Sequence, residues 1–403
     1  MLVYLAGSSV TVLENTLVEK EQVTSGVYYS TDARPDTTIW LTLSSVATKK
    51  LEQVERRVFE LLEETASKPL DMSYLLDCLH LQKRQILCQA EESPQSLTNP
   101  VIQDFLFGKR DGSTLRQLAT MEEYDALEKW TDEQWRAFLR RWISHAPHVS
   151  ILGVPSAKLS AKIKADEEDR VKAQIERLGE DGLAALKRRL ADAKAENDRE
   201  IPRSMLEKFK VPGIESIRFI PTMAGRSGTA RAVDDPMNDA QKAIDKDQPE
   251  SPLFLHFGSI PSNFVLFTLL ISTEKVPVPL RPLLAVYIEN FFSTPIVRDG
   301  QRIDFEQVLT ELERDTIRFR IGEGSIVGVP EVIQIRFRIE TRMYARTIEW
   351  VRELLFDSIF DETVCHTRSS GGRERLLTRC RDSKRPSRSC SPISLTRSAA
   401  APA

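Results

Sequence analysis

Four arginines alternate with apolar residues near the C-terminal end of the sequence. Arg318 and Arg320 are two positions apart in one apolar stretch, and Arg336 and Arg338 are two positions apart in the next. Successive side chains of a strand point to opposite faces, so each pair shares a face. If the two strands pair, four guanidinium groups crowd one sheet face, which is unfavourable unless acids or solvent surround them. The spacing therefore predicts either a surface wetted on one side, the simpler interpretation, or a wall that binds anions.

Other residue patterns that could do chemistry are absent or incomplete. The sequence contains no His-x-x-Glu-His motif or its inverse, no Gly-x-Ser-x-Gly elbow and no phosphate loop. His145 and His148 have a spacing that could chelate a metal, but Pro147 places them in an irregular junction without a nearby cysteine or carboxylate. Cys78 and Cys88 are expected to be core thiols. No catalytic residue and no metal ligand is predicted.

Composition limits the class of protein further. Of the 403 residues, 41% are hydrophobic and 29% charged, enough for two or three domains with real cores. The sequence has five cysteines and no Cys-x-x-Cys pair, which argues against a disulfide framework and against a zinc ribbon. No apolar run approaches the roughly 20 residues that cross a bilayer. The sequence predicts no membrane association and a cytoplasmic location, a mitochondrial one being the weaker alternative.

The C-terminal tail differs in charge from the rest of the chain. Residues 363–403 contain nine basic and two acidic residues, a surplus of seven positive charges, whereas the whole chain carries −3. The remainder therefore carries about −10, which argues against binding to nucleic acid. The tail is rich in Ser, Arg and Pro without apolar periodicity, so it is predicted to be a disordered basic segment.

Residues 1–156 predict a first α/β unit. Residues 27–29 and 38–43 have the alternation of two strands, and apolar residues at three- and four-residue steps predict helices at 51–62 and 72–90. A further helix and a short strand at 149–154 follow. The buried side of that helix is expected to carry Trp135, Phe138, Leu139 and Trp142.

Residues 211–362 predict a second, related unit. Strands are expected at 253–257, 264–271, 316–321 and 332–339, the first two joined by a turn, with three helices at 284–291, 305–312 and 348–355. The order of strands and helices in this segment is similar to that of the first unit, which favours an internal duplication. The predicted fold class is thus α/β, in a layered α+β form, with two related sheet-plus-helix domains.

A charged linker, residues 157–210, separates the two units. Between Lys158 and Glu200 a narrow apolar stripe recurs at three- and four-residue steps among Lys, Arg, Asp and Glu, as in solvated helices. Gly179 and Gly182 are expected to end one helix and to open the next. A helical hairpin of two antiparallel rods is the favoured interpretation, and a single kinked surface helix is the alternative.

Several weak patterns together identify a family. They are Tyr4-Leu-Ala-Gly-Ser-Ser-Val10 running into Leu13-Glu-Asn-Thr-Leu-Val-Glu19, the Pro-Ser-Asn-Phe segment at 261–264, the turn from Ser293 to Gly300, and residues 344–360. With the Leu178-Gly-Glu-Asp-Gly-Leu183 core of the linker, they resemble the pitrilysin/insulinase family of inverted-zincin metallopeptidases. The presequence-protease-like cytosolic members of fungi are the most similar. The resemblance covers nearly all of residues 4–361.

The resemblance implies a particular architecture. Members of this family have four related domains of the LuxS/metallopeptidase type, arranged as two halves joined by a linker around a chamber in which zinc-dependent cleavage of peptides occurs. Their zinc lies on a His-x-x-Glu-His helix of the first domain. This chain would hold a second-domain-like unit, the linker and part of a third domain, so zinc belongs to the full-length family and no cofactor is expected here.

The expected function is therefore that of a non-catalytic fragment of a zinc metalloendopeptidase, which contributes chamber wall without the active site. In the resembled family the outer face of each sheet lines the chamber, so Arg318, Arg320, Arg336 and Arg338 are the predicted substrate-binding residues. The alternative is a stand-alone peptide-binding or regulatory subunit that pairs with a separate zinc-bearing chain. Expected partners are peptides and the missing zinc-bearing half.

Overall fold

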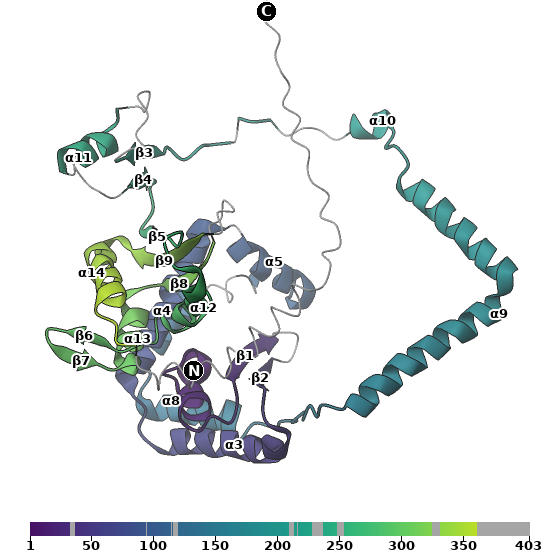
Figure 1. Cartoon of the computed structure of the whole chain (residues 1–403), viewed down its shortest axis with the longest axis horizontal. Helices are drawn as coiled ribbons and strands as arrows, with labels where there is room; N and C mark the ends of the chain where they lie inside the picture. The colour runs from purple at the N-terminus through teal and green to yellow at the C-terminus, as the bar shows by residue number, and fades with distance from the viewer. Residues whose placement is uncertain are drawn as a thin grey trace, which may run out of the picture. The chain divides into compact units, whose positions relative to one another are not determined.

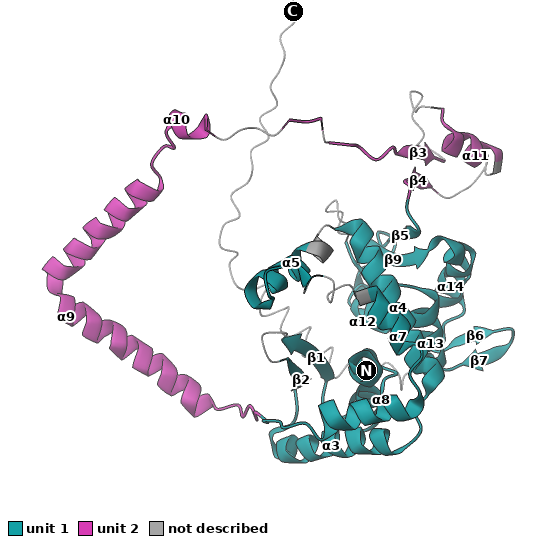
Figure 2. Ribbon diagram, turned by 180° about the vertical axis from the view of Figure 1, so that it is seen from behind, with its two compact units in different colours: residues 1–150, 262–403 teal, residues 151–261 magenta. Residues whose placement is uncertain are grey.

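The computed structural model groups the chain into two compact units. The first contains residues 1–150 and 262–403, and the second contains residues 151–261 (Figure 2). The residues described are 1–32, 37–93, 95–113, 115, 120–208, 213–215, 217–227, 237–247, 254–324 and 331–360. The predicted disordered tail at 363–403 lies outside these ranges. The first unit thus contains most of the first predicted α/β segment and residues 262–362 of the second, whereas residues 211–261 fall in the second unit. The predicted limits between domains remain predictions.

The N-terminal half of the first unit is a β-hairpin packed against helices. Strands β1 (Gly26–Asp32) and β2 (Thr38–Ser44) pair antiparallel, with Val27 opposite Leu43. Helix α3 (Leu51–Ser67) presents Val54, Val58, Leu61 and Leu62 to the core at the predicted spacing. Helix α4 (Met72–Glu92) begins at Asp71, whose carboxylate accepts a hydrogen bond from the Tyr74 amide. These elements were predicted and are confirmed.

Shorter helices complete this half. They are α1 (Leu2–Ala6), α2 (Val12–Glu14), the π-helix η1 (Asn15–Lys20), the 3-10 helix η2 (Thr48–Lys50), α5 (Gln95–Phe107), α7 (Thr120–Leu127), α8 (Asp132–Leu139) and the π-helix η3 (Arg140–Ser144). Residues 149–154, predicted to be a strand, form none, and Val149 and Ile151 are strongly exposed.

The predicted buried side of α8 is wrong at one residue. A capping box between Thr131 and Gln134 begins the helix, and Trp135 and Leu139 are buried as expected. Trp142, however, is exposed, and Ile143 is buried in its place. The chain changes from α-helix to the wider π-helix η3 after Leu139, so each following residue is rotated relative to the α-helical spacing.

The C-terminal half of the first unit is a three-stranded antiparallel sheet covered on one face by helices. Its strands are β5 (Phe264–Ser272), β9 (Val332–Glu340) and β8 (Arg318–Glu323), in that order. Every second residue of β9, from Ile333 to Ile339, is buried. Helices α12 (Leu283–Asn290), α13 (Phe305–Asp315) and α14 (Tyr344–Phe356) supply apolar side chains to the same core (Figure 1).

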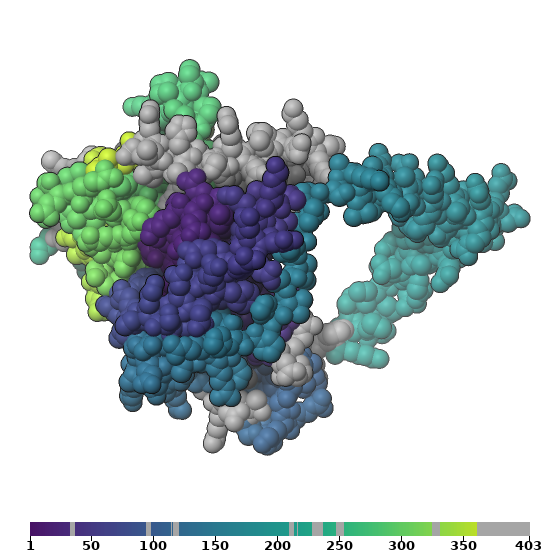
Figure 3. All heavy atoms as spheres, turned by 90° about the horizontal axis from the view of Figure 1, so that it is seen from below, coloured from purple at the N-terminus to yellow at the C-terminus, as the bar shows by residue number. Residues whose placement is uncertain are grey.

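A short hairpin and two 3-10 helices complete the C-terminal half. Strands β6 (Ile296–Arg298) and β7 (Gln301–Ile303) pair at the turn that contains Gly300, whose φ of 77° suits glycine. The 3-10 helices are η5 (Val278–Leu280) and η6 (Thr341–Met343). The two halves of this unit pack together where α4 contacts α13. Figure 3 shows atoms of the N-terminal half, in purple and blue, against those of the C-terminal half, in green.

The second unit is dominated by helix α9 (Ala157–Asn197). Gly179 interrupts it with φ 60° and ψ −174°, a conformation that essentially only glycine adopts. The break was predicted, but the antiparallel rods were not formed: no residue of α9 is buried, and its two arms diverge in Figure 1. Only one residue leaves the helical conformation, whereas a helical hairpin needs a loop of about 2–5 residues. The kinked helix, the alternative interpretation, matches the structure.

The rest of the second unit is small. It comprises α10 (Arg203–Leu206), β3 (Met223–Arg226), α11 (Asp239–Asp247) and β4 (His256–Ser259). The strand predicted at 253–257, joined by a turn to that at 264–271, forms as β4, and it pairs with β3, a strand that was not predicted. Among the described residues, no helix is both long and apolar enough to span a membrane.

Candidate functional site

The four predicted arginines lie on one face of the three-stranded sheet. Strands β8 and β9 pair antiparallel, with Arg318 directly opposite Arg338 and Arg320 directly opposite Arg336. The intervening residues face the apolar core. The strand pairing and the shared face are as the alternation predicted. Like charges that face each other across strands destabilise a sheet by up to about 1 kcal/mol per pair, so something else must hold these residues here.

The surroundings of the four guanidinium groups differ. Arg338 forms an ion pair with Glu92 at the end of α4. Arg336 is half-buried, and its Nε has no hydrogen-bond partner in the part of the chain that the structure describes. Arg318 and Arg320 are exposed, and neither side chain forms an ion pair with any described residue. The positive charge that is free to bind a ligand is therefore concentrated on Arg318 and Arg320.

Arg318 and Arg320 line a cavity of about 460 Å³ within the first unit. Helix α4 supplies one wall through Tyr74, Cys78 and neighbouring residues, and α1 and the following turn contribute Val3, Gly7 and Ser8. Helix α13 supplies Thr310 and Glu313. The cavity thus lies between the two halves of this unit, and the residues that join them beside it are 229 to 239 positions apart in sequence.

Hydrogen bonds to backbone carbonyl groups fix the position of α4 beside the cavity. The Arg84 guanidinium donates from Nη2 to the carbonyl oxygens of Glu313 and Thr316, at 3.3 and 3.4 Å. The Gln85 side-chain amide donates to the carbonyl oxygen of Ile317 at 3.1 Å. Burial lowers the pKa of Arg84, although the carboxylate of Glu340 partly offsets this effect. Because three hydrogen bonds from these two side chains reach the end of α13 and the turn that precedes β8, this wall of the cavity is firmly positioned.

The end of the cavity formed by α13 is acidic. The Tyr74 hydroxyl donates a hydrogen bond to Oε2 of Glu313 at 3.3 Å. Burial raises the pKa of Glu313, and the hydroxyl groups of Ser8 and Tyr74 offset only part of that effect. Glu313 forms no ion pair with any described residue. Burial also raises the pKa of the Cys78 thiol, to about 12, so this thiol is protonated and is no nucleophile.

Apolar side chains share the sheet face with the arginines. Leu266 and Leu270 of β5 are each 52% exposed, and Leu266 is opposite Arg338 in the sheet register. The face therefore offers both positive charge and apolar area, the combination that an extended peptide with acidic and apolar side chains would contact.

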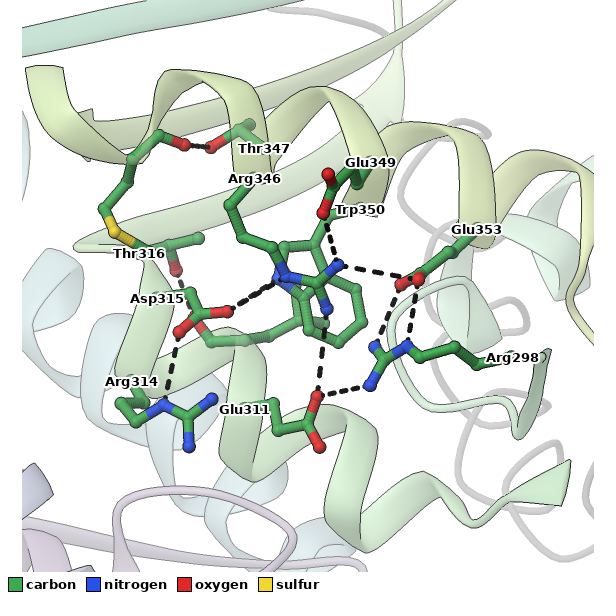
Figure 4. Close-up of polar contacts among 12 residues, drawn as sticks. Arg298, Glu311, Arg314, Asp315, Thr316, Arg346, Thr347, Glu349, Trp350 and Glu353 are labelled. Atoms are coloured by element: carbon green, nitrogen blue, oxygen red, sulfur yellow. Dashed lines mark hydrogen bonds and ion pairs between the residues drawn. The ribbon is translucent and has the colours of Figure 1, made fainter. Parts of the chain in front are cut away.

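A second arginine cluster joins β6, α13 and α14 (Figure 4). The Arg298 guanidinium donates to both oxygens of Glu353 at 2.9 Å and to Glu311 at 2.8 Å. Arg346 has carboxylate groups of four residues within 4 Å: Glu311, Asp315, Glu349 and Glu353. The Cζ atoms of both arginines lie within 5 Å of the centre of the Trp350 ring. Each of the two arginines has carboxylate partners, so this cluster joins elements and leaves no unpaired positive charge for a ligand.

The two histidines considered as metal ligands have other partners. His145 Nε2 lies 2.9 Å from a carboxylate oxygen of Glu63, and the His148 ring stacks on Phe59 with 4.1 Å between centroids. Within the described ranges, no group of three or more His, Cys, Asp or Glu residues has the geometry to hold a metal ion.

Comparison with known proteins gives three relatives and no family. No protein-family model matches the chain. Uncharacterized proteins of Schizosaccharomyces pombe, Saccharomyces cerevisiae and Caenorhabditis elegans are 29%, 26% and 24% identical to it. The alignments cover 93%, 90% and 95% of this chain, but 36%, 36% and 38% of those proteins. The chain therefore spans little more than a third of the length of these relatives.

Sequence reasoning missed the acidic end of the cavity and the second arginine cluster. For Glu313 the available signal is its position four residues after the buried Leu309, which places a carboxylate beside the apolar stripe of α13. For the cluster it is the spacing of Arg346, Trp350 and Glu353, which places all three on one face of a helix.

Proposed function

We propose that this chain is a non-catalytic part of a zinc metalloendopeptidase of the pitrilysin/insulinase type, and that its first unit contributes a peptide-binding wall. One observation carries the peptide-binding role: Arg318 and Arg320 are exposed beside a cavity without a carboxylate partner in the described chain. Acidic side chains of a peptide would supply the missing negative charge, and the exposed Leu266 and Leu270 would contact its apolar residues.

The zinc and the cleavage chemistry would come from a separate part of such a peptidase. The sequence has no His-x-x-Glu-His motif, so a zinc-bearing half is the partner that the proposal requires. The relatives in fungi and the nematode are more than twice as long as the aligned region, which is compatible with additional domains in proteins of this type. The proposal places the protein in the cytoplasm.

Peptide binding is tested by titrating a fluorescent Glu-rich peptide into wild type and into the double variant Arg318→Gln/Arg320→Gln. We expect salt-dependent binding by wild type, because the screening length falls from about 30 Å at 0.01 M salt to about 10 Å at 0.1 M. The variant should lose most of it. Arg352→Gln, which removes one charge from a largely exposed arginine of α14, is the control. Equal binding by wild type and the double variant would refute the peptide-binding role.

The peptidase assignment needs its own experiment. The purified chain should contain no stoichiometric zinc after dialysis and should cleave no peptide, because a catalytic zinc needs three protein ligands and an activated water. The full-length Schizosaccharomyces pombe relative should contain zinc and cleave peptides in a chelator-sensitive manner. Absence of zinc and of peptidase activity from that longer protein would refute the assignment.

The alternative is a stand-alone binding subunit that pairs with a separate zinc-bearing chain. Helix α5 favours it: Val101, Ile102, Phe105 and Leu106 are each about half exposed, an unusual amount of apolar surface for one helix. Size-exclusion chromatography with light scattering distinguishes the two cases, since a stand-alone subunit should form a stable complex with its partner chain.

A further inference from the structure

The cavity beside the arginine face has two chemically different ends. The lining from β8 carries Arg318 and Arg320, and the lining from α13, α4 and the turn after α1 carries Glu313, Tyr74 and Ser8. No described cation pairs with Glu313, and no described carboxylate pairs with Arg318 or Arg320. Positive and negative groups in one cavity would normally neutralise each other if they were in contact. Their separation leaves each end with an unmet charge.

The acidic end is equipped to receive a hydrogen-bond donor. Tyr74 occupies one carboxylate oxygen of Glu313, at 3.3 Å from Oε2. The Ser8 hydroxyl is buried beside this group and makes no hydrogen bond to described residues that meets ordinary geometric limits. A partly buried carboxylate that accepts a side-chain hydrogen bond from Tyr74 is stabilised when a further donor binds, and an ammonium group offers three.

The two ends together select the ligand. A simple anion would be attracted by the arginines but repelled by the Glu313 carboxylate. A simple cation would be attracted by Glu313 but repelled by the arginines. A molecule that carries both charges satisfies both ends, and two arginines can donate hydrogen bonds to two carboxylate groups. The volume of about 460 Å³ is in the range typical of small-molecule sites and exceeds what a single ion needs.

We propose that this cavity binds a small zwitterion, an acidic amino acid, with its ammonium group at Glu313 and its carboxylate groups at Arg318 and Arg320. The site shares two arginines with the proposed peptide-binding face, but it uses Glu313, Tyr74 and Ser8 in addition and does not depend on peptidase function. A peptide that begins with glutamate offers the same groups, so the experiment must separate the free amino acid from the peptide end.

Isothermal titration calorimetry of the full chain tests the proposal with matched ligands. L-Glutamate should bind at least tenfold more tightly than glutarate, which has the two carboxylates but no ammonium group. A tenfold difference corresponds to about 1.4 kcal/mol. This comparison needs no variant, so it stays decisive even if a substitution disturbs folding. A Glu-initiated peptide with a free or an acetylated N-terminus is titrated in parallel.

Two variants locate the ligand. Glu313→Gln should abolish the preference for glutamate over glutarate, whereas Arg318→Gln/Arg320→Gln should weaken both ligands. Glu349→Gln, at an exposed position of α14, should change the binding of neither ligand.

Three results would overturn the proposal: equal binding of glutamate and glutarate, no binding of glutamate, or a preference for glutamate that survives in Glu313→Gln. Binding of only the free-ended peptide would assign the site to peptide ends and would overturn the amino-acid assignment. If the wild-type chain binds glutamate but not the Glu-rich peptide, the peptide-binding role is refuted and the amino-acid site stands.

Discussion

Two arginine clusters of the first unit show how the same residue type serves different purposes. Arg298 and Arg346 are surrounded by carboxylates from α13 and α14, and both contact the Trp350 ring. Arg318 and Arg320 face other arginines across the sheet and have no acidic partner in the described chain. The first arrangement stabilises the fold, whereas the second leaves charge for a ligand. The position of carboxylates, rather than the number of arginines, distinguishes them.

The contrast extends to two carboxylates of α13. Burial alone would raise the pKa of Glu311, but hydrogen bonds from Arg298 and Gln307 lower it below its usual value. Glu313, two residues later, points to the cavity, where burial raises its pKa and no cation offsets the effect. Adjacent turns of one helix therefore present a paired acid to one side and an unpaired acid to the other.

The largest expected effect comes from breaking the paired cluster. Glu353→Gln removes the carboxylate that accepts two hydrogen bonds from Arg298. We expect a loss of about 3 kcal/mol in the free energy of unfolding, because each lost hydrogen bond to a charged group costs about 1.5–3 kcal/mol and partial exposure reduces the sum. Denaturant unfolding measures it. Glu349→Gln, which contacts only the outer side of Arg346, should change stability by less than about 0.5 kcal/mol.

A smaller effect is expected where the arginine face has Glu92 as its acidic partner among the described residues. Glu92→Gln leaves Arg338 unpaired, so all four arginines of the face lack a carboxylate. We expect a loss of about 1 kcal/mol in stability, since this pair is only partly buried. Acidic peptides should bind more tightly at low salt. Unchanged peptide affinity in this variant would show that Arg338 contributes nothing to the face.

Removal of the free arginines should hardly affect stability. Arg318→Gln/Arg320→Gln eliminates two cross-strand pairs of like charge and no described ion pair. We expect unfolding free energy to be unchanged or higher by up to about 0.5 kcal/mol. A loss comparable to that of Glu353→Gln would show that these arginines support the fold after all, and it would erase the distinction between the clusters.

The smallest effect is a difference in pH dependence between two variants of α13. The raised pKa of Glu313 means that its contribution to stability is full below about pH 4.5, the usual value, and is lost as pH rises through the raised pKa. Glu313→Gln should therefore gain stability relative to wild type as pH rises. The lowered pKa of Glu311 reverses the sign, so the advantage of wild type over Glu311→Gln should shrink as pH falls below about 4.5. Thermal melts from about pH 3 to 8, a range that extends below the usual carboxyl pKa, measure both.

Local periodicity was enough to predict the arginine face. The alternation of charged and apolar residues in β8 and β9 is strong, and their antiparallel pairing and shared face are as predicted. The α3 and α4 helices were predicted for the same reason, since their apolar residues recur at helical spacing.

Features that depend on distant contacts were not predicted. The cavity forms because α4 binds the backbone before β8 across more than 200 residues, and no local pattern encodes that contact. The pairing of β4 with β3 is a choice between partner strands, which alternation alone cannot decide. Trp142 was misplaced because the change to a π-helix alters the residue spacing that the prediction assumed.

The single non-helical residue of α9 sets the mechanical properties of the segment. Its two arms, of 22 and 18 residues on either side of Gly179, are about 33 and 27 Å long at 1.5 Å per residue. Rotation about the two backbone bonds of Gly179 alone therefore changes the distance between the ends of α9 by tens of ångströms, while each arm stays rigid. A β-carbon at this position would exclude the observed conformation, so replacing Gly179 by alanine would convert a jointed spacer into a nearly straight rod of fixed reach.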